Sequence, residues 1–212
     1  MEVIGTYIIV TKPVLPHAVI AEKCVQHGVR MLQLREKHLS DKELLSIARE
    51  MRSITKGTQT KFVINDRPDI AILCDADYLH LGQGDISINN ARAIIGNMKI
   101  GLSTHSIQQA KEALKKNPDY IGFGPIYPTN AKVKPDKPVG VELLKEVLAF
   151  SNVPVVAIGG IFPENIKNII KVGAQNVAMV RYFMQSDNFK KQYESLGKLL
   201  EDIALVDSLS LL

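Results

Sequence analysis

The chain has 212 residues, of which 46% are hydrophobic and 23% are charged, a composition typical of a globular protein with one sizeable core. Its 26 basic and 22 acidic residues give a net charge of +4 without long charged runs, which does not favour nucleic-acid binding but allows a small anionic substrate. Cys24 and Cys74 lie in apolar segments, so we expect reduced, buried thiols in a cytoplasmic protein. No run approaches the roughly 18 apolar residues of a membrane span, and no signal-peptide pattern is present.

Short apolar runs alternate with longer amphipathic segments along the whole chain. The runs predict strands at Thr6–Thr11, Met31–Arg35, Lys61–Asn65, Tyr78–Leu81, Lys99–Ser103, Tyr120–Gly124, Pro154–Ile158 and Asn176–Val180. The segments predict helices at Pro13–His27, Ser40–Thr55, Pro68–Cys74, Ser87–Ile95, Ser106–Lys116, Val141–Phe150, Pro163–Val172 and Asn188–Ile203. Ser40 and Glu43 have the spacing of a capping box, and Gly28 is placed to end the first helix.

The unbroken alternation of strand and helix predicts a parallel sheet that is buried on both faces. Closing this sheet gives a single (β/α)8 TIM barrel near the lower size limit of that fold. An open doubly wound sheet is the alternative, but no Gly-x-Gly-x-x-Gly follows the first strand. No linker divides residues 1–212, so we expect one domain, whose apolar tail at about 203–212 could cover the barrel or contact another subunit.

In a TIM barrel the active site lies where the strands run into their following loops, so polar residues at these positions are candidates for function. They are Gln33, Arg35 and Lys37 after the second strand; Asn65, Asp66 and Arg67 after the third; His80 to Asp85 after the fourth; Ser103 to His105 after the fifth; Gly122 to Lys132 after the sixth; Gly159 and Gly160 after the seventh; and Arg181 after the eighth. We therefore expect one polar mouth.

Two acids, Asp66 and Asp85, follow consecutive strands of this predicted barrel. Neighbouring parallel strands lie about 4.8 Å apart, so two ionised carboxylates at their ends repel each other unless a cation lies between them. Oxygen ligands of this kind suit Mg²⁺, which takes one or two carboxylates and completes its coordination with water and substrate phosphate. The pair predicts a Mg²⁺ site for a diphosphate substrate, although each Asp alone could instead cap the following helix.

A phosphate group also needs cations or hydrogen-bond donors to bind it. Positive charge around the mouth could come from Lys37 and Lys132, with Arg35 and Arg67. The turn Gly159–Gly160 could expose backbone N–H groups to an anion, because loops after strands seven and eight are the recurrent phosphate site of this fold. A Gly-Gly pair can also serve only as a tight turn, and lysines are often merely solvated, so both interpretations stay open.

Two histidines, His80 and His105, also lie near the predicted mouth. His80 falls within the alternation of the fourth strand, and His105 precedes a helix. We interpret both as residues that orient their surroundings by hydrogen bonding rather than as groups that transfer protons.

Five ordered blocks of sequence carry a resemblance to a known family. They are "QLREKHLSDKEL", "VINDRPDIAILCDADYLHLGQGD", "IGLSTHS", "DYIGFGPIYPTNAK" and "VPVVAIGGI". In these blocks the chain resembles the thiamine-phosphate synthases, also called thiamine-phosphate pyrophosphorylases, of the family that includes the thiazole tautomerases. The resemblance implies transfer of a pyrimidinylmethyl group from its diphosphate to the ring nitrogen of a thiazole phosphate, with Mg²⁺ as cofactor and small molecules as the only substrates.

The resemblance also implies roles for individual residues. Asp66 and Asp85 would hold Mg²⁺. Contacts to the diphosphate or the pyrimidine would come from Arg35, Lys37, Asn65, Ser103 and Lys132, among which Arg35, Ser103 and Lys132 are the candidate catalytic residues. The pyrimidine would accept or donate hydrogen bonds at Gln33, and the thiazole phosphate would meet Thr129, Gly159 and Gly160.

Two positions depart from the family pattern. The family loop commonly reads Thr-x-Thr-Lys, where this chain has Ala131 in place of the second hydroxyl. After the eighth strand the family usually shows Ser-Ala-Ile, and here Arg181 begins the segment Arg181-Tyr182-Phe183. Arg181 could replace the missing phosphate contact with a stronger, charge-assisted one, or it could obstruct the pocket.

Two alternatives to a synthase remain. A thiazole tautomerase of the same family carries a histidine where this chain has Pro125, and it often lacks the metal acids, so the sequence favours the synthase. The other alternative is a catalytically silent barrel that binds thiamine intermediates or a protein partner.

Overall fold

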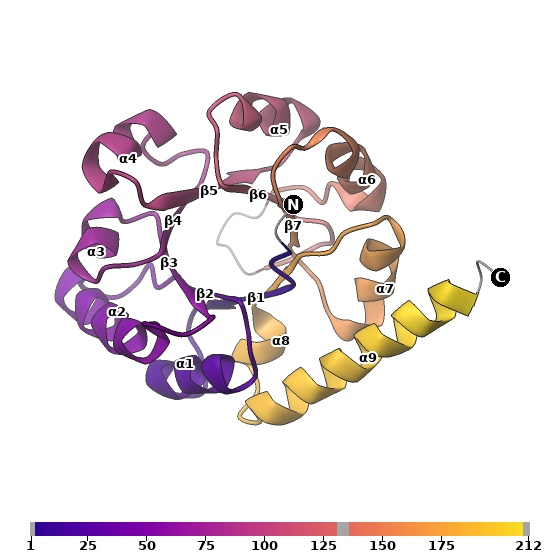
Figure 1. Ribbon diagram of the computed structural model, residues 1–212, viewed down its shortest axis with the longest axis horizontal. Helices are drawn as coiled ribbons and strands as arrows, with labels where there is room; N and C mark the ends of the chain where they lie inside the picture. Colours follow the sequence, from indigo (N-terminus) through magenta and orange to yellow (C-terminus); the bar gives the residue numbers. More distant parts are fainter. Residues whose placement is uncertain (1–2, 131–135, 210–212) are drawn as a thin grey trace.

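The structure is a computed structural model that describes residues 3–130 and 136–209, with side chains as far as Ile203. Its parallel strands pair in chain order, and β1 also pairs with β8, which closes the sheet into a barrel (Figure 1). The strands are β1 (Thr6–Val10), β2 (Met31–Leu34), β3 (Lys61–Asn65), β4 (Tyr78–Leu81), β5 (Lys99–Thr104), β6 (Tyr120–Phe123), β7 (Val155–Ile158) and β8 (Val177–Met179). The predicted TIM barrel is therefore confirmed, and the open sheet is wrong.

A ring of helices surrounds the barrel (Figure 1). They are α1 (His17–Gln26), α2 (Asp41–Thr55), α3 (Pro68–Leu73), α4 (Ile88–Ile95), α5 (Ile107–Leu114), α6 (Gly140–Phe150), α7 (Pro163–Lys171), α8 (Arg181–Met184) and α9 (Phe189–Leu209). The capping box at Ser40 and Glu43 is present at the start of α2, and Gly28 has the left-handed φ of 71° expected after a helix end. No helix among the described residues is long and apolar enough to cross a membrane.

Three helices differ from the prediction by more than two residues at one end or were not predicted at all. The first begins at His17 rather than Pro13, because Pro16 disfavours helical backbone at Leu15 and itself occupies the N-cap position. The single-turn helix α8 was not predicted, since four residues carry no helical period. The last helix continues past Ile203 to Leu209 and packs against α1, α7 and α8, so most of the predicted tail is helical backbone.

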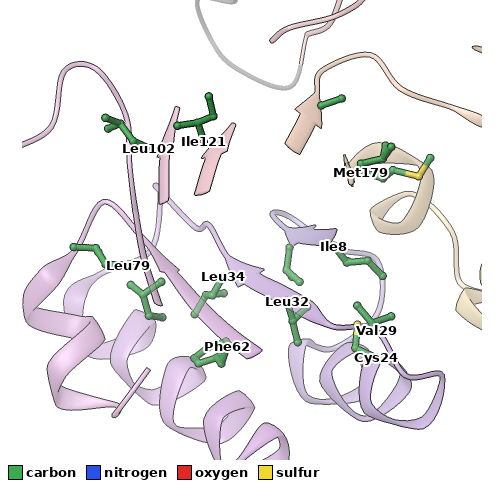
Figure 2. Close-up of a cluster of buried hydrophobic side chains, with 14 of the residues drawn as sticks. Ile8, Cys24, Val29, Leu32, Leu34, Phe62, Leu79, Leu102, Ile121 and Met179 are labelled. Carbon is green, nitrogen blue, oxygen red and sulfur yellow. The ribbon is translucent and has the colours of Figure 1, made fainter. Parts of the chain in front are cut away.

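The strands are apolar on both faces because each face packs against a different set of side chains. The outer cluster joins the strands to the helices, and in Figure 2 Leu32 and Phe62 point from their strands toward these helices. The inner cluster fills the barrel below its mouth and includes three aromatic residues, Tyr7, Tyr78 and Tyr120. The polar residues that line the cavity consequently lie beyond this cluster, where the strands end.

A single glycine makes room for one of the three tyrosine rings in the barrel interior. A Cβ atom placed on Gly101 of β5 would lie 2.0 Å from Cζ of Tyr120, far closer than real side-chain atoms approach. The ring of Tyr120 is thus seated directly on the backbone of the neighbouring strand, with only 1% of the residue exposed. Space for this ring depends on the missing side chain at residue 101.

Replacing Gly101 with alanine should therefore force Tyr120 out of its place. We expect Gly101→Ala to lower the free energy of unfolding by about 1–3 kcal/mol, the usual cost of overpacking a core, measured by urea denaturation. Gly197→Ala in α9 is the control, because nothing lies within 4 Å of its added Cβ, and it should stabilise the helix by about 0.5–1 kcal/mol. Equal stability of the two variants would contradict the packing described here.

Candidate active site

A cavity of about 610 Å³ opens where the strands run into their following loops. Most of the predicted site residues that the structure describes line it, with Arg67 as an exception: Gln33, Arg35, Lys37, Asn65, Asp66, Asp85, Ser103, Thr129, Gly159, Gly160 and Arg181. Lys132 and Ala131 lie outside the described residues. The loops after strands far apart in the sequence thus meet at one mouth, as the barrel topology requires.

The two acids meet at the ends of β3 and β4. The carboxyl groups of Asp66 and Asp85 lie within hydrogen-bonding distance of each other, and Asp85 Oδ2 also accepts a hydrogen bond of 2.7 Å from the N–H of Gly82. Burial raises the pKa of Asp85, and the neighbouring carboxyl raises it further. Burial also acts on Asp66, but hydrogen bonds from Asp85 and Lys37 outweigh it and hold the pKa of Asp66 below its ordinary value.

Neither acid caps the helix that follows it. The N-cap residue of α3 is Arg67, without a side-chain hydrogen bond, and the N-cap of α4 is Ser87, whose Oγ accepts from the N–H of Asn90. The capping interpretation is therefore wrong for both acids. Their carboxyl groups are directed at each other and at the cavity instead.

The backbone at Asp66 is strained. Its φ of 60° places a non-glycine residue in the left-handed region, while its N–H still donates to the carbonyl oxygen of His80 at 2.8 Å. A side chain in this region costs about 1–3 kcal/mol, and such residues cluster at sites of function. The strain turns the chain sharply at the end of β3, so that the Asp66 carboxyl group faces Asp85.

The nearest cation to the acids is Lys37. Its Nζ lies 2.5 Å from Asp66 Oδ2, and its side chain is 59% exposed, so it can move to another anion at little cost. Arg35 lines the same side of the cavity. Arg67 does not contribute there, because its guanidinium group binds Asp41 and Asp69 on the outer surface, and the expectation that it supplies charge to the mouth is wrong.

A buried carboxylate anchors the segment that carries these cations. Glu36, between Arg35 and Lys37, has only 1% of its side chain exposed and accepts hydrogen bonds from the Lys12 N–H at 2.7 Å and from His17 Nε2 at 2.9 Å. The first of these bonds ties the end of β2 to the loop after β1. Arg35 and Lys37 consequently extend from a backbone that is held on its outer side.

The glycine turn after β7 packs directly against the loop after β6. A Cβ on Gly159 would lie 2.4 Å from Cβ of Pro125, and a Cβ on Gly160 would lie 2.6 Å from the carbonyl oxygen of Pro128. Both glycines also have positive φ values, 98° and 65°. Only glycine permits this contact, which brings the turn and Thr129 to the same side of the cavity.

Arg181 enters the cavity from the end of β8. Its guanidinium carbon lies 5.0 Å from the centre of the Phe162 ring, a cation–π contact that holds the side chain along the wall. Arg181 and Phe162 both line the cavity beside the glycine turn. Cationic side chains therefore line the cavity after both neighbours of β1: Arg35 and Lys37 after β2, and Arg181 after β8.

Both histidines make hydrogen bonds to neighbouring residues, and that they orient these residues rather than transfer protons stays a prediction. His105 Nδ1 lies 2.5 Å from the carbonyl oxygen of Gly124, at the start of the loop after β6. His80 lies within reach of Ser103 Oγ through Nε2 and of the Tyr120 hydroxyl through Nδ1, both at 2.8 Å. The tyrosine was missed from sequence because it was counted as an apolar strand residue, and only its inward position on β6 could have marked it.

The sequence of the chain was compared with known families and proteins. Residues 7–183 match the profile of the family described as thiamine monophosphate synthase. A thiamine-phosphate synthase of Lawsonia intracellularis is 39% identical over 85% of this chain and 84% of its own length. One from Persephonella marina is 40% identical over 85% of this chain and 87% of its own length.

Solved structures give the same result. A thiamine phosphate pyrophosphorylase from Pyrococcus furiosus superposes with a TM-score of 0.83 and 32% identity, covering 94% of this chain and 96% of its own. A 3-hexulose-6-phosphate synthase, 15% identical with a TM-score of 0.66 over 92% of this chain and 99% of its own, shares the fold alone. With a matching family profile over most of its length and relatives of this identity, the chain belongs to the thiamine monophosphate synthase family.

Proposed function

We propose that this protein is a thiamine-phosphate synthase that transfers the hydroxymethylpyrimidine group from its diphosphate to thiazole phosphate. The C–O bond to the diphosphate breaks and its electron pair leaves with pyrophosphate, while the lone pair of the thiazole nitrogen forms the new C–N bond. The observation that carries this proposal is a single cavity with acids and cations at the ends of β2 to β4 and a second cationic, glycine-lined wall at β7 and β8. Two phosphorylated substrates need two separate sets of groups that bind phosphate.

The acid pair fits a Mg²⁺ ion. Asp66 and Asp85 offer carboxylate oxygens at one point, and the described part of the chain holds no group of three or more His, Cys, Asp or Glu side chains that could bind a metal ion. Two carboxylates suit Mg²⁺, whose remaining sites are filled by water and substrate phosphate. When bound, the ion would neutralise the charge of the diphosphate.

The chain's own residues have distinct tasks in this proposal. Arg35 and Lys37 bind the diphosphate and stabilise the charge that grows on it as the C–O bond breaks. Gln33 and Ser103 orient the pyrimidine diphosphate, and Asn65 contacts it beside Asp66. In the loops after β6 to β8, Thr129, the Gly159–Gly160 turn and Arg181 hold the phosphate of the thiazole so that its nitrogen faces the reacting carbon.

A coupled assay tests the function. The purified protein with pyrimidine diphosphate, thiazole phosphate and Mg²⁺ should produce thiamine phosphate, read by oxidation to fluorescent thiochrome. Replacing Mg²⁺ with EDTA should abolish the product, because the acids then repel the diphosphate. Absence of product at high enzyme concentration with Mg²⁺ would refute the synthase, and full activity in EDTA would refute the metal site.

The acid pair also predicts an effect on stability. In Asp85→Asn the side-chain amide can donate to Asp66 while its oxygen keeps the bond from Gly82, so the metal-free variant should be more stable to urea by about 1 kcal/mol. Mg²⁺ should raise the melting temperature of the wild type and leave that of the variant unchanged.

Asp77→Asn is the matched control for this variant. Asp77 accepts hydrogen bonds from Arg52 Nη1 at 2.9 Å and from the Phe62 N–H at 2.8 Å, away from the cavity. Weakening these bonds should lower the free energy of unfolding by about 1–3 kcal/mol. If Asp85→Asn proves equally damaging, its carboxyl group is a structural partner and not a metal ligand.

Arg181 predicts a selective effect on one substrate. Arg181→Ala should raise KM for thiazole phosphate by about 10- to 100-fold, the value of a charge-assisted hydrogen bond, and should leave KM for the pyrimidine diphosphate unchanged. Arg181→Lys keeps the charge but loses the planar stack on Phe162, and an intermediate KM is expected. Faster turnover in Arg181→Ala would instead show that the arginine obstructs the pocket.

A further inference from the structure

We propose that Tyr7, Tyr120 and His80 are positioning residues that hold the Ser103 hydroxyl as a hydrogen-bond donor to the pyrimidine diphosphate. They belong to a chain of hydrogen bonds, here named the interior relay, that runs from Gln33 on β2 to Ser103 on β5. The inference rests on the proposed function for the substrate, whereas the relay itself is a property of the folded chain.

The interior relay crosses the barrel just below the floor of the cavity. Gln33 Nε2 lies 2.6 Å from the Tyr7 hydroxyl, which lies 2.9 Å from the Tyr120 hydroxyl. The Tyr120 hydroxyl is 2.8 Å from His80 Nδ1, and His80 Nε2 is 2.8 Å from Ser103 Oγ. Neither tyrosine lines the cavity, and each is only 1% exposed, so the relay acts from beneath the residues that contact substrate.

The hydrogen bond between Gln33 and Tyr7 determines which atom is the donor in each of the other bonds of the interior relay. The Gln33 amide nitrogen can only donate, so the Tyr7 oxygen accepts and the Tyr7 proton is left for Tyr120. In the reverse direction the Tyr7 oxygen would accept twice, and its own buried O–H would have no acceptor among the described residues. A buried donor without a partner is costly, which favours the direction from Tyr7 to Tyr120.

The donor of each remaining bond, from Tyr120 through His80 to Ser103, follows in the same way. Tyr120 accepts from Tyr7 and donates to His80 Nδ1, so the imidazole proton is on Nε2 and is donated to Ser103 Oγ. The Ser103 oxygen is thereby occupied as an acceptor, and its own proton is directed at the cavity that it lines. Burial raises the pKa of both Tyr7 and Tyr120 above the ordinary value, so each phenol keeps the proton that it passes on.

A serine fixed as a donor suits this substrate. Diphosphate oxygens and pyrimidine ring nitrogens are acceptors, and a hydroxyl that presented its lone pairs to them would repel them. A donor oriented before binding also costs no reorganisation when negative charge grows on the leaving group. Gln33, at the other end of the relay, has its amide held in one orientation by the same bonds, so both ends present a defined pattern to the substrate.

Kinetics of tyrosine variants test the role. Tyr120→Phe keeps the ring that fills the space beside Gly101 but frees His80 Nδ1, so the imidazole proton can move to Nδ1 and Ser103 can donate to His80 instead. We expect kcat to fall by about tenfold, the value of one hydrogen bond, with KM for thiazole phosphate unchanged. In a Ser103→Ala background, Tyr120→Phe should have almost no further effect, because the group it positions is absent.

Tyr78→Phe is the matched control. The Tyr78 ring lies 6.0 Å from that of Tyr120 in the same aromatic layer, and none of the four hydrogen bonds that define the interior relay joins Tyr78. Its variant should keep the wild-type kcat. Fully additive effects of Tyr120→Phe and Ser103→Ala, or an equal loss in Tyr78→Phe, would show that the tyrosine acts only through packing and would overturn the proposal.

A second measurement needs no substrate. Nitrogen-15 NMR of histidine-labelled protein should show His80 protonated on Nε2 and unprotonated on Nδ1, with the signals assigned from a His80→Gln variant. In Tyr120→Phe this preference should be lost. A proton on Nδ1 of the wild type would overturn the relay even in an active enzyme, whereas the expected tautomer in a protein that makes no thiamine phosphate would refute the proposed function instead.

Discussion

The carboxyl groups of Asp66 and Asp85 meet at the ends of two neighbouring strands, and the charge they bring together limits what the mouth of the barrel can bind. Such a pair is unfavourable when both groups are ionised, so it must share a proton, face an ammonium group or receive a metal ion. Lys37 supplies an ammonium group to Asp66. The strained backbone of Asp66 maintains this arrangement, although a relaxed loop would separate the charges.

The remaining features support the cavity around this pair. Glu36 is buried behind the cationic segment, and the glycine turn after β7 lets the loop after β6 approach to contact distance. Below the floor of the cavity, the missing side chain at Gly101 leaves space for the Tyr120 ring, whose hydroxyl group belongs to the interior relay. Glu36 and Tyr120 lie outside the set of residues that would touch substrate, yet each supports residues of that set.

The fold and the positions of both acids could be predicted from the sequence, because strand ends and the alternation of strands with helices follow from local sequence patterns. The strands at Lys61–Asn65 and Tyr78–Leu81 were predicted to the residue, which was enough to place both acids. The sequence could not distinguish an acid that caps a helix from an acid that faces the cavity, since both occur between a strand and the helix that follows it. It also missed the relay, because Tyr7 and Tyr120 are 113 residues apart and each alone resembles an apolar core residue.

The central claim is that the acid pair binds the diphosphate through a divalent cation. Isothermal titration of the wild-type protein with pyrimidine diphosphate, without thiazole phosphate, tests it most directly. The account predicts measurable binding in Mg²⁺ and its loss in EDTA, because Lys37 alone does not compensate the charge of two carboxylates and a diphosphate. Equal affinity in Mg²⁺ and in EDTA would contradict the account.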